Sequence, residues 1–479
     1  MILSLPSLAD FQTIVPELVL GALVVMALLL ELGGQEEQAE PPIARLAPLA
    51  LLGLIGWLFT RPGRESFLGF NLMVVDDGIS RALALVVSLA LLLTFTVGVG
   101  ELDYHRVGFR GEFFALLLSA GLGMVLMGAA NNLIVIFLGL ELFSLSLYLL
   151  CVFFPHEPAS QESGLKYFIL SSAASAVMLY GMALIYGATG STWLGEIMAS
   201  LEHEPGLLVR AGMMLVLAGL AFKVSAVPLH NWTPDVYEGA PTSVTAFMSV
   251  ATKAAALTVL IRIFAHQKGE FSPVWMAMVG GLVVTSVLTG NLMALAQTRV
   301  KRMLAYSGIG HAGYLLMAIT AQGSADGALY FYLVVYAFMN VGAFLAVLCL
   351  EQALQTEVTI ESCRGLASRN PLWAWSFALC LVALAGLPPT GGFLAKYFLF
   401  SAVLEAGQAA LPAIGLIGSF IGAAYYLGLV LKIFSSSDEE EQQPPLEMPS
   451  GALLGLALCA FGALALGLAP GPLFGWIGL

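Results

Sequence analysis

Stretches of continuously apolar residues recur along the whole chain, and most are long enough to cross a bilayer as a helix. An apolar run of roughly 18 residues or more spans about 30 Å of hydrocarbon as an α-helix. Of the 479 residues, 59% are hydrophobic and only 10% are charged, whereas soluble domains carry about 25% charged residues. The runs do not alternate apolar and polar residues as the strands of membrane barrels do. The sequence therefore predicts an all-α polytopic membrane protein with about fourteen transmembrane helices.

Charge and cysteine content place few further constraints on function. The net charge of −12 comes largely from acidic connectors such as GGQEEQAEPP and SSSDEEEQQPP, which are typical of solvated loops. The five cysteines form no CxxC motif or Cys/His cluster, so we interpret them as small buried hydrophobic residues and expect no metal site. No dinucleotide or phosphate loop appears either. No Lys or Arg precedes Arg45, which favours a retained first span over a signal peptide.

Five charged residues lie inside apolar runs, namely Glu141, Lys166, Lys223, Lys253 and Lys396. One isolated charge at the centre of a membrane helix costs about 2.5–3.5 kcal/mol on insertion scales. Together, unpaired, these residues would cost about as much as the whole stability of an ordinary domain, about 5–15 kcal/mol. We therefore expect their side chains to face one another or internal water. For Lys166, which lies near the start of its span, snorkelling to the interface is the alternative.

Lysines outnumber carboxylates within these spans, and this imbalance indicates more than a static ion pair. A single ion pair accounts for one glutamate and one lysine, but the spans contain four lysines and only one carboxylate. Removal from water disfavours the charged form of an amine, so a buried lysine can accept and release a proton, whereas arginine stays charged. His230 and His311 add groups that titrate near neutral pH. The pattern favours a proton relay; for the two histidines, satisfied core residues are the alternative.

Helix-breaking residues interrupt two of the spans, each close to a lysine. Pro228 follows Lys223 in GLAFKVSAVPLHNW, and two prolines and two glycines precede Lys396 in LVALAGLPPTGGFLAKYFLF. Proline lacks an N–H and clashes with the carbonyl four residues earlier. Non-helical backbone at membrane depth must be shielded by protein or line a wet cavity, so we expect Lys223 to donate to the carbonyl freed at Val224. The alternative is that the first of these spans simply ends at Pro228.

The layout of the two interruptions predicts two inverted repeats. An odd number of predicted spans separates them, which reverses the membrane orientation, and paired interruptions of this kind indicate a transport site. Lysine and arginine placement, dominated by TRVKR at 298–302, predicts that both termini lie outside the cytoplasm. The expected segments are a three-helix segment (1–110), a first repeat of helices 4–8 (111–265), a second repeat of helices 9–13 (273–434) and a C-terminal helix (451–479).

Several long motifs resemble one known family. GLELFSLSLY, AFKVSAVPLHNWTPDVYEGAPTSVTAFM, KRMLAYSGIGHAGYLLMA and AGLPPTGGFLAKYFLF are similar to subunit N of bacterial NADH–quinone oxidoreductases (respiratory complex I) over about residues 75–435. More distantly, the chain resembles cation/proton antiporter subunits. The resemblance implies a fourteen-helix antiporter-like subunit of the cell inner membrane, with discontinuous helices 7 and 12. A lysine at position 396, together with DVYEGAP, favours subunit N over the antiporter-like member that has glutamate there.

The resemblance also implies roles for particular residues. Glu141 would pair with Lys223 and modulate its charge, and the proton would then pass through the central Lys253 and His311 to Lys396. The implied relay set is Glu141, Lys166, Lys223, His230, Lys253, His311 and Lys396. NADH, FMN, Fe–S clusters and quinone would be bound by other subunits, so we expect no cofactor on this chain. The expected partners are the other membrane-arm subunits and lipid, with neither nucleic acid nor a second copy of the chain.

Three other functions remain open at this level. A subunit of a multi-subunit cation/proton antiporter would share the buried lysines. A structural assembly subunit would carry them as inert residues. Direct quinone binding is the third, although no polar site for a quinone headgroup stands out in the sequence.

Overall fold

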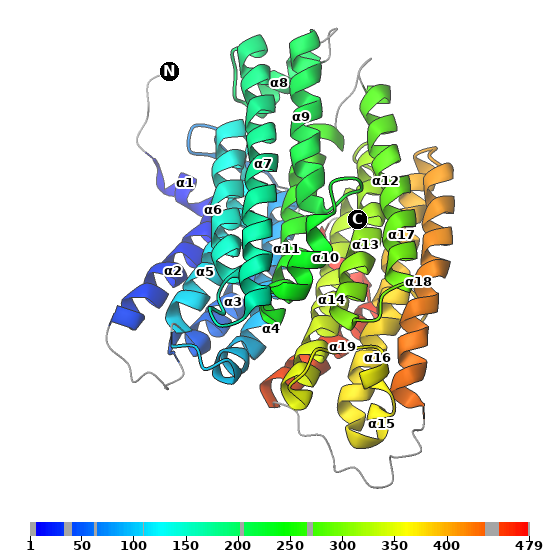
Figure 1. Cartoon of the computed structure of the whole chain (residues 1–479). Coiled ribbons are helices and arrows are strands. Elements are labelled where there is room, and N and C mark those ends of the chain that lie inside the picture. Colours follow the sequence, from blue (N-terminus) through cyan, green and yellow to red (C-terminus); the bar gives the residue numbers. More distant parts are fainter. Residues whose placement is uncertain are drawn as a thin grey trace.

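Long helices run side by side in a single bundle (Figure 1). The computed structural model describes residues 6–32, 41–61, 65–108, 110–201, 206–265, 272–435 and 450–477. Within these residues, eleven helices are long and apolar enough to cross a membrane, and Ile43–Phe59 and Pro371–Ala385 are shorter apolar helices. The prediction of an all-α polytopic membrane protein is therefore confirmed. The two acidic connectors fall almost wholly outside the described residues.

The first part of the chain is mainly helical, with one small hairpin. Its elements are α1 (Leu8–Gln12), α2 (Val15–Leu32), α3 (Ile43–Phe59), the antiparallel strands β1 (Phe67–Gly69) and β2 (Val74–Asp76), and α4 (Gly78–Tyr104). Asp77 begins α4 as its N-cap, because its carboxylate accepts the backbone N–H of Ser80 at 2.8 Å. Burial raises the pKa of Asp77, but two 2.9 Å bonds from the Arg262 guanidinium outweigh burial and hold its pKa below the usual value.

The rest of the chain forms two successive groups of helices. The first contains α5 (Arg110–Ala129), α6 (Leu133–Cys151), α7 (Pro158–Thr189), α8 (Leu194–Leu201), α9 (Leu207–Val224), α10 (Trp232–Gly239) and α11 (Thr242–Leu260), which continues as a π-helical turn, Ile261–Ala265. The second contains α12 (Ser272–Leu295), α13 (Val300–Thr320), α14 (Asp326–Leu354), a 3-10 turn (Glu361–Cys363), α15 (Leu366–Arg369), α16 (Pro371–Ala385), α17 (Gly391–Glu405) and α18 (Ala410–Phe434). The last helices are α19 (Ser450–Leu468) and α20 (Gly471–Ile477).

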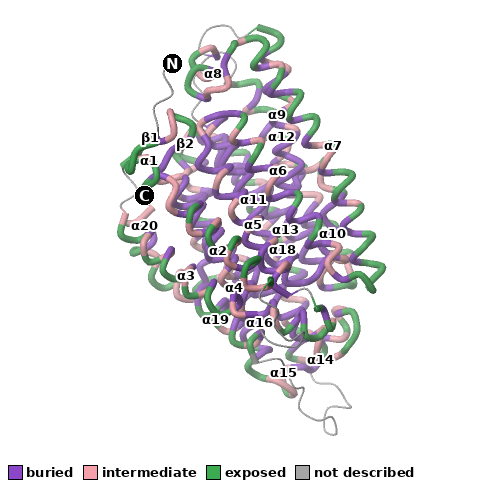
Figure 2. The backbone as a smooth tube through the Cα atoms, turned by 90° about the vertical axis from the view of Figure 1, so that its left-hand side faces the viewer, coloured by how far each residue is buried: buried purple, intermediate pink, exposed green. Residues whose placement is uncertain are grey.

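Two helices form the centre of the bundle. α11 is buried along its whole length and α14 along nearly all of it, and the two pack against each other. Buried residues gather along the middle of the bundle, whereas peripheral helices such as α2 and α7 expose their outer faces (Figure 2). A helix that is apolar on every face must be enclosed by protein or by lipid. Polar residues on α11 and α14 are therefore enclosed by other helices.

The same order of neighbour contacts occurs in both groups. In the first, α5 packs on α6, α7 on α9 and α5 on α11; in the second, α12 packs on α13, α14 on α16 and α17, and α12 on α18. Figure 1 shows α5–α7 on one side of the bundle and α16–α18 on the other. The division into two five-helix repeats stays a prediction, as does the inverted relation of 111–265 to 273–434.

Both predicted interruptions are present. α9 ends at Val224, four residues before Pro228, where Ser225 adopts a left-handed φ of +69°, and the helix resumes as α10 at Trp232. α16 ends at Ala385, where Gly386 has a φ of +82°, and the chain resumes as α17 at Gly391. The alternative that the first helix runs to Pro228 and simply ends there is wrong. The turn begins earlier because a residue in the left-handed region already closes the helix.

Candidate functional site

Backbone groups at the first break form hydrogen bonds with side chains of neighbouring helices. The carbonyl of Phe222 accepts the indole N–H of Trp232 at 3.1 Å. The N–H of Val227 donates to Ser286 Oγ at 2.9 Å, and the carbonyl of Val227 accepts from Thr285 Oγ1 at 3.2 Å. Thr285 and Ser286 lie on α12, in the second group of helices. The break is thus shielded by protein, as backbone at membrane depth requires.

Lys223 is buried, but its amine does not bond to the backbone groups of the break. Its Nζ donates to Ser144 Oγ on α6 at 2.7 Å and to Ser171 Oγ on α7 at 2.6 Å, and its exposed fraction is 1%. The expectation that Lys223 donates to the freed Val224 carbonyl is therefore wrong. A side chain on a helix leans towards the N-terminus of that helix, so an amine placed just before the end of α9 points away from the break.

The expected pair between Glu141 and Lys223 is not closed in this structure. Among the described residues, no carboxylate oxygen lies within 4 Å of Lys223 Nζ, and Glu141 Oε1 is buried without a hydrogen-bond partner. Ser144, one turn after Glu141 on the same helix, holds the amine instead. The serine hydroxyls and the carboxylate are therefore alternative partners for Lys223. The role of Glu141 stays a prediction.

Lys253 is enclosed at the centre of the bundle. It lies on α11 with an exposed fraction of 0%, and its Nζ donates to Tyr237 Oη at 3.1 Å and to the carbonyl of Ser249 at 3.0 Å. Tyr237 belongs to α10, the short helix after the first break. The break thus brings a hydroxyl to the central lysine. As expected, this amine faces the interior of the bundle and not lipid.

His311, on α13, is surrounded by tyrosines. Its Nδ1 is hydrogen-bonded to Tyr332 Oη at 2.8 Å, and its Nε2 lies 3.4 Å from Tyr426 Oη. Tyr426 is in turn hydrogen-bonded to Ser307. Because a neutral imidazole has one donor and one acceptor nitrogen, the tyrosine hydroxyls can follow either tautomer by rotating. His311 therefore sits in a buried chain of groups that can all exchange donor and acceptor roles.

Lys396 closes the second break. Its Nζ donates to the carbonyls of Leu384 and Ala385 at 3.2 and 3.0 Å, which are at the C-terminal end of α16, and it lies 5.2 Å from the ring centre of Tyr314. Only 6% of Lys396 is exposed. Lysines near the C-terminus of a helix can bond its last carbonyls. Here the lysine comes from the next helix, α17, and leans back across the break.

Aromatic side chains join the three buried lysines. Tyr167 is stacked on Trp232 at a centroid distance of 4.8 Å and lies 5.7 Å from Lys223 Nζ. Trp232 contacts Tyr237 at 6.0 Å, which reaches Lys253. On the other side, His311 contacts Tyr314 at 5.5 Å, next to Lys396. Tyr336 lies between the two halves, because its ring centre is 5.1 Å from that of His311 and its Oη and Lys253 Nζ both lie within 3.5 Å of the position that a Cβ would take at Gly308. The structure thus brings Lys223, Lys253, His311 and Lys396 onto one buried line. The contributing tyrosines were missed from the sequence, although YFYLVVYAFMN at 330–340 places four polar groups in an apolar run.

Lys166 and His230 lie off this line. Lys166 Nζ forms ion pairs with Glu162 at 2.7 Å and Asp235 at 2.9 Å, and 41% of its side chain is exposed. This is the position that the snorkelling alternative predicts. His230 is half-buried in the first break, and its Nδ1 is among the buried atoms that lack a partner within the described part of the chain.

Ion pairs tie α10 to the second group of helices. Asp235 accepts from Arg302 at 2.9 Å, and Glu238 accepts from Arg302 and from Arg299, each at 2.7 Å. Arg299 and Arg302 stand at the start of α13. The cluster TRVKR, singled out above for orientation, thus also anchors the helix that carries Tyr237.

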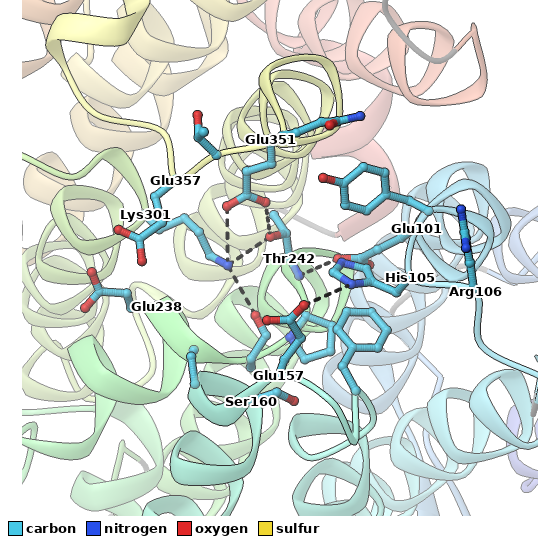
Figure 3. A pocket seen from close by; sticks show the side chains of 18 residues that line it. Glu101, His105, Arg106, Glu157, Ser160, Glu238, Thr242, Lys301, Glu351 and Glu357 are labelled. Carbon is cyan, nitrogen blue, oxygen red and sulfur yellow. Dashed lines mark hydrogen bonds and ion pairs between the residues drawn. The ribbon is translucent and has the colours of Figure 1, made fainter.

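A polar pocket opens at the end of the bundle where α11 begins (Figure 3). Its volume is about 480 Å³, and Glu101, His105, Glu157, Lys301 and Glu351 are among its lining residues. The Glu101 carboxylate accepts the backbone N–H groups of Thr242 and Ser243 at 2.7 and 3.1 Å, which caps the N-terminus of α11. Burial lowers the pKa of His105, and the nearby Glu157 opposes this shift. The pocket therefore places ionisable groups beside the N-terminal end of the helix that carries Lys253.

Comparison with known proteins gives consistent results over nearly the whole chain. The family described as NADH:quinone oxidoreductase/Mrp antiporter, TM, matches residues 130–422. The NADH-quinone oxidoreductase subunit N of Myxococcus xanthus (strain DK1622) is 38% identical, over 98% of this chain and 97% of that protein. A chain of respiratory complex I from Thermus thermophilus with bound aureothin is 36% identical, with a TM-score of 0.79 over 95% of this chain and 97% of that chain.

A more distant structure shares the fold. A chain of the Mrp complex from Dietzia sp. DQ12-45-1b has a TM-score of 0.81 at 23% identity and covers 98% of this chain and 96% of that chain. At this identity the likeness concerns the fold alone. The identity of more than a third across almost the full length of subunit N relatives is the stronger finding, and by it the chain belongs to the NADH-quinone oxidoreductase subunit N family.

Proposed function

We propose that this chain carries protons across the membrane as a membrane-arm subunit of an NADH–quinone oxidoreductase. The observation that carries the proposal is the enclosure of Lys223, Lys253 and Lys396, whose exposed fractions are 1%, 0% and 6%, on one line with His311. Burying three amines inside a membrane protein costs free energy, and intramembrane ionisable residues usually mark an ion or proton path. NADH, FMN, Fe–S clusters and quinone are bound by other subunits, and this chain contributes no redox centre of its own.

The proton moves along the buried line in steps between neighbouring groups. Glu141 sets the charge of Lys223 by approaching or leaving it, while Ser144 and Ser171 hold the amine in the open arrangement. The proton reaches Lys253 past Tyr237, then His311 and Lys396. The pocket beside Glu101 supplies water at the start of α11. Both termini lie on the periplasmic side of the cell inner membrane.

The energies required are within the range of ordinary side-chain interactions. Moving one charge against 100 mV takes about 2.3 kcal/mol. A change of one to two pKa units, at about 1.4 kcal/mol each, supplies this amount. Exchanging carboxylate and hydroxyl partners at a buried amine gives a change of this order, because hydrogen bonds to charged groups contribute about 1.5–3 kcal/mol.

Replacement of the central lysine tests the proposal. We expect Lys253→Met to abolish coupled proton translocation in the purified complex reconstituted in vesicles, with assembly retained. Lys432→Met is the matched control, because Lys432 forms an exposed ion pair with Glu361 at 2.7 Å. Assembly with unchanged pumping in Lys253→Met would show that the lysines are inert.

The antiporter alternative is tested by the composition of the complex. We expect this chain to copurify with flavin- and Fe–S-containing subunits. Copurification only with other antiporter subunits, together with sodium-dependent proton exchange, would overturn the assignment.

A further inference from the structure

Lys223 is enclosed by three aromatic rings as well as by hydroxyls. Its Nζ lies over the ring of Phe143 at 5.2 Å from the ring centre, over that of Tyr167 at 5.7 Å and over that of Tyr148 at 5.9 Å. Phe143 and Tyr148 belong to α6, and Tyr167 belongs to α7. A cation within about 6 Å of the centre of an aromatic ring is attracted by the negative face of that ring. These three rings, the aromatic cage, therefore surround the amine with partial negative charge.

The other two buried lysines have different surroundings. Within the described residues, Lys253 and Lys396 each have one ring at this distance, at 5.2 Å from the amine. Both amines also donate to backbone carbonyls, whereas Lys223 donates only to two serine hydroxyls in the same part of the chain. The cage is thus found at the amine that has no carbonyl acceptor.

Hydroxyls and rings respond differently to the charge of the amine. A hydroxyl can donate or accept a hydrogen bond, so Ser144 and Ser171 can bond Lys223 in either protonation state. An aromatic face attracts a cation through the ring quadrupole, and this attraction is lost when the amine is neutral. Among these contacts, the rings are therefore the ones that favour the charged amine.

Packing holds the rings of the cage in place. Phe143 and Tyr167 are fully buried, and Tyr148 is nearly so. Tyr148 and Tyr167 meet edge to face, with ring centres 5.0 Å apart and an interplanar angle of 83°. Tyr167 is also stacked on Trp232 of α10 at 4.8 Å. The ring faces are thus held towards the amine by contacts that do not involve its charge.

We propose that Phe143, Tyr148 and Tyr167 hold Lys223 in its protonated form in the open arrangement, in which Glu141 does not contact the amine. The three are positioning residues, because they act through the lysine and exchange no proton themselves. Their attraction sets how readily Lys223 releases its proton to the next group on the buried line. This inference rests on the proposed function above.

The effect of the cage can be separated from that of the titratable groups around it. Among the described residues, Glu141 and Tyr148 face Lys223 from α6 and Tyr167 from α7, while α11, which also packs on α9, carries Lys253. A change confined to the ring of Phe143 leaves all of these groups in place and disfavours only the charged amine. The amine then loses its proton at lower pH, so the alkaline limb of the pumping rate moves to lower pH.

Stepwise fluorination of Phe143 is the first test. Fluorine withdraws electron density from the ring face and changes the ring size little, so the packing is kept while the attraction for a cation falls. With one, two and three ring fluorines introduced into the intact complex reconstituted in vesicles, we expect the alkaline limb of proton translocation to move to lower pH in steps, by about one pH unit in all. The same series at Phe331 is the control, because this buried ring packs on Phe398 and Phe474. An unchanged pH profile across the Phe143 series would overturn the proposal.

The second test separates the ring of Tyr148 from its hydroxyl. We expect Tyr148→Leu to move the alkaline limb of proton translocation to lower pH, because one face of the cage is lost. Tyr148→Phe, which restores a ring without the hydroxyl, should reverse most of that shift. Equal shifts in the two variants would show that the hydroxyl acts on Lys223 and not the ring, which would overturn the cage.

The outcomes also separate this inference from the proposed function. If Lys253→Met abolishes pumping while the fluorinated Phe143 series and Tyr148→Leu keep the wild-type pH profile, the relay stands and the cage fails. If Lys253→Met pumps normally, the proposed function itself fails. If Tyr148→Leu does not assemble, the fluorinated series decides, because it leaves the size of the ring almost unchanged.

Discussion

The two interrupted spans end their first helices alike but use their lysines differently. In each, a residue with positive φ closes the helix, Ser225 after α9 and Gly386 after α16. At the first break, the carbonyl of Phe222 accepts from the indole of Trp232 and from the backbone N–H of Ser225, and Lys223 donates only to hydroxyls. At the second break, Lys396 itself covers the freed carbonyls.

One geometric rule explains the difference. Side chains on a helix lean towards its N-terminus. Lys223 precedes its break, so it leans away, whereas Lys396 follows its break and leans back onto the end of α16. A lysine that satisfies backbone carbonyls is part of the fold, while a lysine held by hydroxyls can leave without orphaning any backbone group. Ser144, for example, also donates to the carbonyl of Leu140 at 2.5 Å. Lys223 is therefore the lysine that can exchange partners.

The largest expected contrast concerns stability when each lysine is removed. Lys396→Met leaves two carbonyls in the interior without their donor, and we expect a loss of about 1–3 kcal/mol in unfolding free energy. Lys223→Met should cost less than about 1 kcal/mol, because hydroxyls readily find backbone acceptors. Thermal denaturation of the purified complexes in one detergent measures both. Equal losses, or a larger loss for Lys223→Met, would contradict the comparison.

Exchange of the two helix-closing residues gives the next largest effect. Gly386→Ser introduces a side chain at a φ of +82°, with its Cβ only 2.8 Å from Lys396 Cδ, so we expect a loss of roughly 1–2 kcal/mol from backbone strain and slower pumping. Ser225→Gly should be nearly neutral, since it removes the strain of a φ of +69° but also the acceptor of the 2.8 Å bond from Thr233. The same denaturation assay tests the pair, and strong destabilisation by Ser225→Gly would show that the two positions are not equivalent.

The third prediction concerns Trp232, whose indole N–H donates to a carbonyl at the first break, as the Lys396 amine does at the second. Trp232→Phe removes the N–H bonded to Phe222 and should cost about 1 kcal/mol, while the ring contact with Tyr167 is largely kept. Trp375→Phe serves as the control, because Trp375 is 67% exposed. A shift in the denaturation midpoint no larger than that of the control would mean that the backbone N–H of Ser225, which also donates to Phe222 at 3.0 Å, satisfies this carbonyl without the indole.

The spans and their two interruptions could be predicted from sequence, because hydropathy and proline report directly on membrane depth and on helix geometry. The side of each helix that faces the core of the bundle could not be predicted from the sequence. In a membrane, both lipid and protein interior favour apolar residues, so the pattern around Lys166 looks like that around Lys253, although one is partly exposed and the other enclosed. Nor could the sequence show that Ser144 and Ser171, not Glu141, hold Lys223, because this depends on the packing of three helices.

The hydrogen bond between Val227 and Ser286 joins positions 59 residues apart in the chain. The bend after α9 is synthesised before α12 exists, so its amide has no acceptor from that helix while the earlier spans enter the bilayer. A nascent chain that stops before α12 would therefore hold an unfinished bend in lipid. Biogenesis of the first group of helices is completed only by the arrival of the second.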